Sequence, residues 1–281
     1  MSALLRFFSN LTRARGAKLA LILLAPIIFS AVAAEMITVY NPLRTGVGPM
    51  LSPPSFKYPF GTDQAGGDVY SQVIFGARVA LYVGLISTLI ALFIALIIGL
   101  PAGYFGGMLD EVLMRATDVV LSIPSFVLII FIVILFGSNI HIITLVIGIV
   151  SWPTLARIIR AQVLSLRERE FVLAVKAVGA GSADIMVTEI LPNIWLPLLP
   201  AVTLQIGSSI LVEAGLSFLG LGDPNAVSWG RVLWLASRSI YLGAWWGILM
   251  PGLAIIITIL AFNLLGDAIG QLTSAKKSTN I

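Results

Sequence analysis

Residues 172–193, VLAVKAVGAGSADIMVTEILPN, form a semi-polar stretch in a chain that is otherwise largely soluble in lipid. The residues before its central glycines are mostly helix formers, whereas Gly179 and Gly181 permit a sharp change of direction. Ser182 or Asp184 can then cap a second short helix. The stretch therefore predicts a helix, an elbow and a second helix.

Two interpretations of this stretch follow from its residues alone. Its small apolar side chains give a face that can lie close to another surface: Ala174, Ala177, Val178 and Ala180. Pro192 pre-sets the backbone where the next apolar run begins. The stretch is either an ordinary loop on the membrane surface or a segment that another protein grips.

The composition of the whole chain is that of an integral membrane protein. Of 281 residues, 58% are hydrophobic and 11% are charged, and the mean hydropathy is +1.02. A hydrocarbon core of about 30 Å takes about 20 apolar residues per helical crossing, which predicts about six spans here. The apolar runs are residues 19–40, 73–104, 112–136, 140–164, 194–219 and 244–269.

These runs are expected to be α-helices, so the fold class is an all-α membrane protein. They lack the alternation of a barrel strand, and in hydrocarbon every backbone polar group needs a partner within the protein. Several prolines predict kinks within the spans or near their ends: Pro26, Pro101, Pro124, Pro153, Pro200 and Pro251.

The distribution of basic residues predicts the orientation. If the N-terminus is cytoplasmic, 12 of the 17 Lys and Arg residues lie on the cytoplasmic side, as the positive-inside rule requires. The remaining five lie outside: Arg44, Lys57, Arg78, Arg231 and Arg238. Both termini and residues 172–193 are then cytoplasmic, in a multi-pass protein of the cell membrane.

The same reasoning divides the chain into segments. Residues 1–18 are a cytoplasmic start, residues 19–40 are the first transmembrane helix, which is retained as an anchor, and residues 41–72 are extracellular. Residues 73–270 form a five-helix core that contains the cytoplasmic segment 167–192, and residues 271–281 are a cytoplasmic tail.

The central stretch resembles the cytoplasmic signature of permease subunits in binding-protein-dependent ABC importers. That signature has an Ala-rich turn, a Gly and then Leu-Pro about a dozen residues later, which correspond here to Ala174, Gly179, Leu191 and Pro192. The match has departures, because Leu173 stands where the signature begins with Glu.

Further stretches resemble one branch of that family, the second permease subunit of dipeptide, oligopeptide and nickel importers. They are FGTDQAGGDVYSQVIFGARVAL (60–81), RATDVVLSIPSFVLII (115–130), EAGLSFLGLGDPNAVSWGRVL (213–233) and AFNLLGDAI (261–269). The resemblance covers residues 60–269 in the order that the family has them. It implies a type I ABC importer permease fold and import of peptides, with nickel or oligosaccharides as the alternative substrates.

The resemblance also implies partners and a coupling site. The family's permease works with a second homologous permease, two cytoplasmic ATPases that bind ATP and Mg, and an extracellular substrate-binding protein; this chain itself would hold no cofactor. Segment 167–192 would be the coupling-helix pair that lies in a groove of an ATPase. The residues expected to carry that contact are Ala174, Val175, Val178, Gly179, Ala180, Leu191 and Pro192.

A second group of candidates lies in the outward part of the chain. Glu213 has no basic residue near it in sequence, so it either lines the pathway or makes a structural contact, for example with Arg231 or Arg238. Ser217, Trp229 and Arg231 complete the set of pathway or gate candidates, although tryptophan is also common at membrane interfaces.

No catalytic or metal-binding pattern appears in the sequence. It has no cysteine, no His-Glu-x-x-His, no Gly-x-Ser-x-Gly and no phosphate-binding Gly-Lys-Ser/Thr loop, and the sole histidine, His141, is expected at a membrane interface. Asp118 is expected to pair with Arg115, three residues earlier. A stand-alone secondary transporter stays a less favoured alternative, because few charges fall in mid-membrane and no inverted repeat is clear.

Overall fold

The computed structural model describes residues 15–278, and in that range the chain is built from helices and loops with one isolated β-bridge, Thr62–Asp68. Most of the predicted segment 1–18 and the last residues of the predicted tail lie outside the described residues. The helices are α2 (Arg15–Ile37), α3 (Val69–Phe105), α4 (Gly107–Leu121), α5 (Ser125–Phe136), α6 (Ile140–Leu166), α7 (Glu170–Ala177), α8 (Ser182–Asp184), η1 (Ile185–Ile190), α9 (Leu191–Phe218), α10 (Trp229–Ser237), η2 (Ile240–Leu242) and α11 (Trp246–Ser278).

The predicted spans correspond to helices of the structure. Five helical stretches in the described part of the chain are long and apolar enough to cross a membrane, and a bent pair of helices brings the number to as many as six. The all-α membrane class is therefore confirmed. The last helix continues to Ser278, so residues that the sequence assigned to the tail are helical.

The third predicted span, residues 112–136, is not one continuous helix. It is broken into α4 and α5, whose axes differ by 77°. Pro124 stands at the break, directly before the first residue of α5. A proline lacks the N–H of the helical ladder and disfavours a helical conformation in the residue before it.

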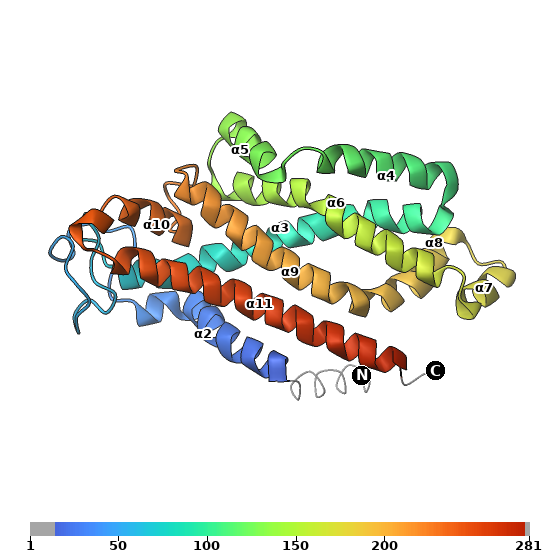
Figure 1. Cartoon of the computed structure of the whole chain (residues 1–281), viewed down its shortest axis with the longest axis horizontal. Coiled ribbons are helices and arrows are strands. Elements are labelled where there is room, and N and C mark those ends of the chain that lie inside the picture. Colours follow the sequence, from blue (N-terminus) through green and yellow to red (C-terminus); the bar gives the residue numbers. More distant parts are fainter. Residues whose placement is uncertain (1–14, 279–281) are drawn as a thin grey trace.

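The spans pack around α3, α6 and α9 (Figure 1). Helix α11 lies beside α9 on one side, with α2 against α11 and α3, and α4 and α5 lie against α6 on the other side. Helices α7 and α8 are at one end of the molecule, here called the α7 end, and α10 is at the opposite end, the α10 end. Helix α2 begins towards the α7 end and α11 finishes towards it, so the spans alternate in direction.

Small residues bring α3 and α6 into close contact. A Cβ atom added to Gly99 would lie 2.6 Å from the carbonyl oxygen of Ala156, and one added to Gly103 would lie 2.7 Å from Cβ of Val163. Small residues allow such backbone approach between membrane helices, where van der Waals packing drives association. The α3–α6 pair is the closely packed centre of the fold at the α7 end.

Helix α4 is attached in a different way. Thr117 is its only buried residue, and two ion pairs join the helix to α6: Arg160–Asp110 and Arg157–Asp118. The predicted local pair between Asp118 and Arg115 was wrong, because Asp118 pairs across to α6. Helix α4 is therefore held mainly by charge, whereas α3 is held by packing.

Candidate functional site

The candidate coupling segment is a helix, an elbow and a second helix at the α7 end of the molecule. Helix α7 ends at Ala177, and the backbone turns at Gly179, whose φ angle is +87°. That left-handed conformation is readily adopted by glycine and costs other residues energy. The helix–elbow–helix geometry predicted from the two glycines is therefore present.

The second helix of the segment differs from the expectation in two respects. Its N-cap is Gly181, and no side chain caps it, so the predicted cap by Ser182 or Asp184 was wrong. Helix α8 also continues without interruption through a π-helical turn, η1, into α9. At that transition the backbone N–H of Leu191 donates to Met186, five residues earlier, directly before Pro192.

One side of the segment is fixed to the rest of the protein. Val172, Ile185 and Ile190 are buried in a cluster with residues of α3, α6 and α9. Three of the expected coupling residues pack against the same cluster and are partly buried: Val175, Ala180 and Leu191. These apolar contacts join the segment to the spanning helices, so a displacement of one is passed to the other.

The opposite side of the segment is free in this chain. The remaining expected coupling residues are exposed: Ala174, Val178, Gly179 and Pro192. Val178 is the most open of them, with 86% of its surface exposed, and nothing lies within 4 Å of a Cβ placed on Gly179. An exposed apolar valine beside a bare elbow is the kind of surface that a partner protein covers.

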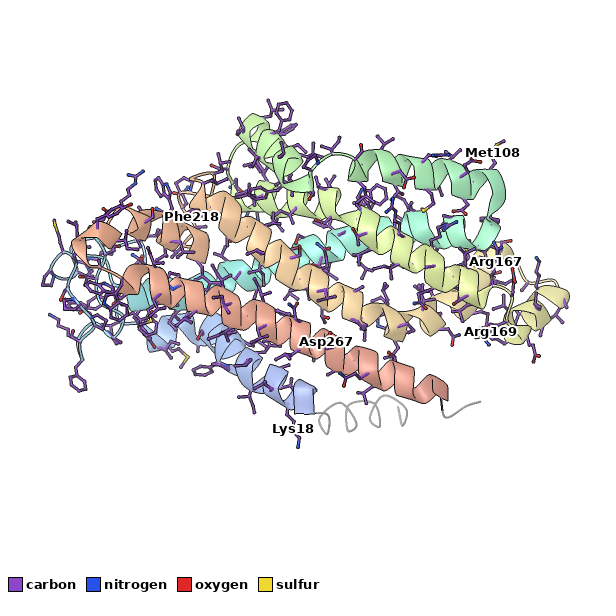
Figure 2. The ribbon with its side chains drawn as sticks, viewed as in Figure 1. Lys18, Met108, Arg167, Arg169, Phe218 and Asp267 are labelled. Carbon is purple, nitrogen blue, oxygen red and sulfur yellow. The ribbon has the colours of Figure 1, made fainter. Side chains whose placement is uncertain are left out.

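Basic and aromatic side chains flank this exposed side. Figure 2 shows Arg167 and Arg169 at the α7 end, with Met108 at the same end on α4 and Phe218 towards the other end. The Arg167 guanidinium donates to the carbonyl of Gly103 at 3.2 Å, which joins the end of α6 to α3. A pocket of about 410 Å³ lies beside α7, lined by Tyr104, Phe105, Arg167, Glu168, Val172, Leu173, Lys176 and Ser182.

Two of the candidates at the α10 end, Glu213 and Ser217, form a buried polar pair. Glu213 is 2% exposed and accepts a hydrogen bond of 2.6 Å from the Ser217 hydroxyl, one turn further along α9. The predicted contact with Arg231 or Arg238 was wrong. In this conformation the carboxyl group of Glu213 makes a polar contact within α9.

Trp229 and Arg231 also make contacts within the chain. The indole of Trp229 is buried and donates to the carbonyl of Val73 at 2.8 Å, which ties α10 to α3. Arg231 donates to the carbonyls of Pro224 and Ala226 in the loop before α10. Both residues therefore hold α10 and its loop against the spans.

Sequence reasoning missed two residues that build this end of the molecule. Asp223 is buried in the loop between α9 and α10, where its carboxylate bonds to the first backbone N–H of α6. Gly230 lets α10 lie directly on α9, because a Cβ there would be 2.1 Å from the carbonyl oxygen of Ala214. The sequence shows that Gly230 lies within SWGRV, but it does not indicate which backbone segment this glycine packs against.

Substitution of Gly230 by alanine is expected to destabilise the chain by about 1–3 kcal/mol, because the added methyl group has no room against α9. The expected result is a lower thermal midpoint of the purified protein in detergent. Gly252, where nothing lies within 4 Å of an added Cβ, is the matched control. Equal midpoints for Gly230→Ala and Gly252→Ala would contradict the close contact.

The sole histidine lies near the α10 end of α6 and has an ordinary structural contact. Its Nδ1 lies 2.7 Å from the Tyr82 hydroxyl, and the two rings meet edge to face. Within the described residues no group of three or more His, Cys, Asp or Glu side chains is arranged to hold a metal ion.

The fold and the exposed segment define a class of protein: a multi-pass membrane protein with a helical elbow between two of its spans. The family model for binding-protein-dependent transport system inner membrane components matches residues 95–278. A putative peptide permease protein of Brucella suis is 38% identical over 266 residues, covering 94% of this chain and 87% of that protein.

Two further relatives are similar over most of their length. A dipeptide transport system permease protein of Alkalihalophilus pseudofirmus is 36% identical, covering 93% of this chain and 86% of that protein. A di/tripeptide transport system permease protein of Pseudomonas aeruginosa is 35% identical, covering 95% and 90%. The chain belongs to the family of binding-protein-dependent transport system inner membrane components, and it is a permease subunit that works with other subunits.

Proposed function

We propose that this chain is one of two membrane-spanning subunits of an ATP-driven importer of peptides, and that its α7–α8 segment receives the movement of an ATPase partner. The proposed coupling role rests on one observation, which is that the two sides of this segment differ. One side is buried against three spans, and the other exposes Val178 and the elbow at Gly179. The names of the relatives support peptides as the substrate class.

The proposed orientation places the α7 end in the cytoplasm. Arg167, Arg169 and Lys176 belong to that end, which agrees with the excess of Lys and Arg expected there. ATP and Mg would be bound by the ATPase partners, and this chain would supply the contact that converts closure of the ATPase dimer into a movement of α6 and α9. The α10 end would then face a substrate-binding protein outside the cell.

Purification of the tagged chain from its native membrane tests the assembly. We expect two ATPase chains, a related permease and a substrate-binding protein to co-purify, as identified by mass spectrometry. Recovery of the chain as a stable, solitary protein would contradict the coupling role and would favour a self-contained transporter.

Uptake by the complex reconstituted in lipid vesicles tests the substrate. We expect accumulation of a labelled dipeptide that needs both ATP and the binding protein. Labelled nickel and a labelled oligosaccharide are the matched comparisons. Accumulation of either of these without accumulation of the dipeptide would overturn the peptide assignment and keep the importer assignment.

A further inference from the structure

Asp223 joins two spans at the end of the molecule that is opposite to the coupling segment. Its Oδ2 accepts a hydrogen bond of 3.0 Å from the backbone N–H of Ile140, the first residue of α6. Its Oδ1 accepts one of 2.8 Å from the backbone N–H of Asn225 in its own loop. The residue is 7% exposed, so both bonds are shielded from water.

The loop that carries Asp223 is itself held firmly. Arg231 donates to two of its carbonyls, at Pro224 and Ala226, and the N–H of Ala226 donates to the carbonyl of Asp223. Gly222 lies tightly against α9, because a Cβ there would be 2.3 Å from the Ser217 hydroxyl. The loop therefore moves with α9, and Asp223 connects that unit to α6.

The same two helices are connected at their other ends by the coupling segment. Helix α6 ends at Leu166 and α9 begins at Leu191, and the residues between them contain α7 and α8. Helices α6 and α9 are thus linked by the chain at the α7 end and by the Asp223 carboxylate at the α10 end. A push on the coupling segment that separates their far ends must break this carboxylate bond as well as the apolar cluster that Leu216 of α9 shares with Ile143 and Ile147 of α6.

We propose that Asp223 is a positioning residue that keeps α6 and α9 together as one rigid unit. A displacement of the coupling segment then moves the α10 ends of both helices together. This inference rests on the proposed coupling function. The carboxylate suits the task because it accepts from the N–H of Ile140, which has no partner within α6, at the start of a helix where negative charge is stabilised by the helix dipole. Without it only apolar packing would hold the α10 ends of α6 and α9 together, and part of the ATP would be hydrolysed without transport.

The test compares Asp223→Ala with Asn139→Ala in the reconstituted complex. Asn139 also caps the start of α6, since its side chain accepts from the N–H of His141, but its bond stays within one segment of the chain. We expect Asp223→Ala to raise the ATP hydrolysed per peptide imported by roughly tenfold or more, the effect of losing one hydrogen bond to a charged group. Asn139→Ala is expected to leave that ratio near the wild-type value.

An unchanged ratio in Asp223→Ala, or equal changes in the two variants, would overturn the proposal. If Asp223→Ala does not assemble, Asp223→Asn decides, because an amide has one acceptor oxygen for two N–H donors. We then expect a smaller rise in the same ratio, and a wild-type ratio in Asp223→Asn would contradict the role.

A distance measurement separates this proposal from the transport assignment. The chain has no cysteine, so two spin labels can be placed by Leu145→Cys on α6 and Asn225→Cys in the loop. We expect one narrow distance distribution with Asp223 and a broader one with Asp223→Ala, whatever the substrate is. Distance distributions of equal width would refute the proposal that Asp223 keeps α6 and α9 together. Failure of the wild-type complex to import peptides would refute only the proposed substrate.

Discussion

Substitution of Gly179 by leucine is expected to abolish transport while the chain still inserts in the membrane and remains folded. The elbow has a φ angle of +87°, which costs a residue with a side chain about 1–2 kcal/mol. The side chain would also project from the exposed side of the segment, beside Val178, where we propose that an ATPase binds. The measurement is ATP-dependent peptide uptake by vesicles that contain equal amounts of complex.

Gly107 provides a matched control for the Gly179 variant. It also has a positive φ angle, +57°, with nothing within 4 Å of an added Cβ, and it begins α4 at the same end of the molecule. Gly107→Leu therefore imposes a similar backbone strain outside the coupling segment, and we expect most of the uptake to remain. Uptake by Gly179→Leu that matches uptake by Gly107→Leu would mean that the elbow is not part of the coupling contact.

The spans and the elbow could be predicted because each depends on local sequence. An apolar run long enough to cross the membrane has no stable alternative to a helix. The predicted run 140–164 therefore agrees with the observed bounds of α6 within a few residues. Likewise, Gly179 adopts a positive φ angle at the predicted turn. These features need no knowledge of neighbouring helices.

The effect of each proline could not be predicted from the same local rule. Pro101 and Pro153 lie inside α3 and α6, which remain single helices, whereas Pro124 separates α4 from α5. Helices α3 and α6 are in close contact through Gly99 and are held in line by packing. Helix α4 buries only one residue, so little packing opposes the bend.

The polar contacts between spans were also beyond local reasoning. Asp118 bonds to a residue 39 positions away, and Asp223 bonds to one 83 positions away. A charged residue in or near a span is expected to have a partner, but the sequence does not show which helix supplies that partner. For Glu213 the sequence offered an arginine as one possible partner, whereas the structure pairs it with the Ser217 hydroxyl of its own helix.

The Arg160–Asp110 ion pair is expected to be needed for transport because it ties the poorly packed α4 to α6. The guanidinium meets the carboxylate through two hydrogen bonds, one of them 2.6 Å between Nη2 and Oδ2, and the aspartate side chain is only 14% exposed. Asp110→Ala leaves the arginine unpaired near the hydrocarbon, and we expect a loss of about 1–3 kcal/mol of stability with a large fall in uptake.

The second pair on the same two helices supplies the control for this prediction. The side chains of Arg157 and Asp118 are 52% and 49% exposed, so Asp118→Ala is expected to cost less than about 1 kcal/mol and to leave most of the uptake. Equal losses of stability and uptake in the two aspartate variants would show that the strength of these ion pairs between α4 and α6 does not depend on their burial.

Exchange of the two charges tests whether Asp110 and Arg160 act through the bond between them. If the bond itself holds α4 to α6, Asp110→Arg combined with Arg160→Asp should recover part of the uptake that each single change removes, which gives a favourable interaction energy in a double-mutant cycle. Losses that simply add would mean that Asp110 and Arg160 act separately. Partial recovery would instead show that the Arg160–Asp110 bond makes α4 follow α6, and with α6 the coupling segment, so that the broken span moves although little of its surface is packed.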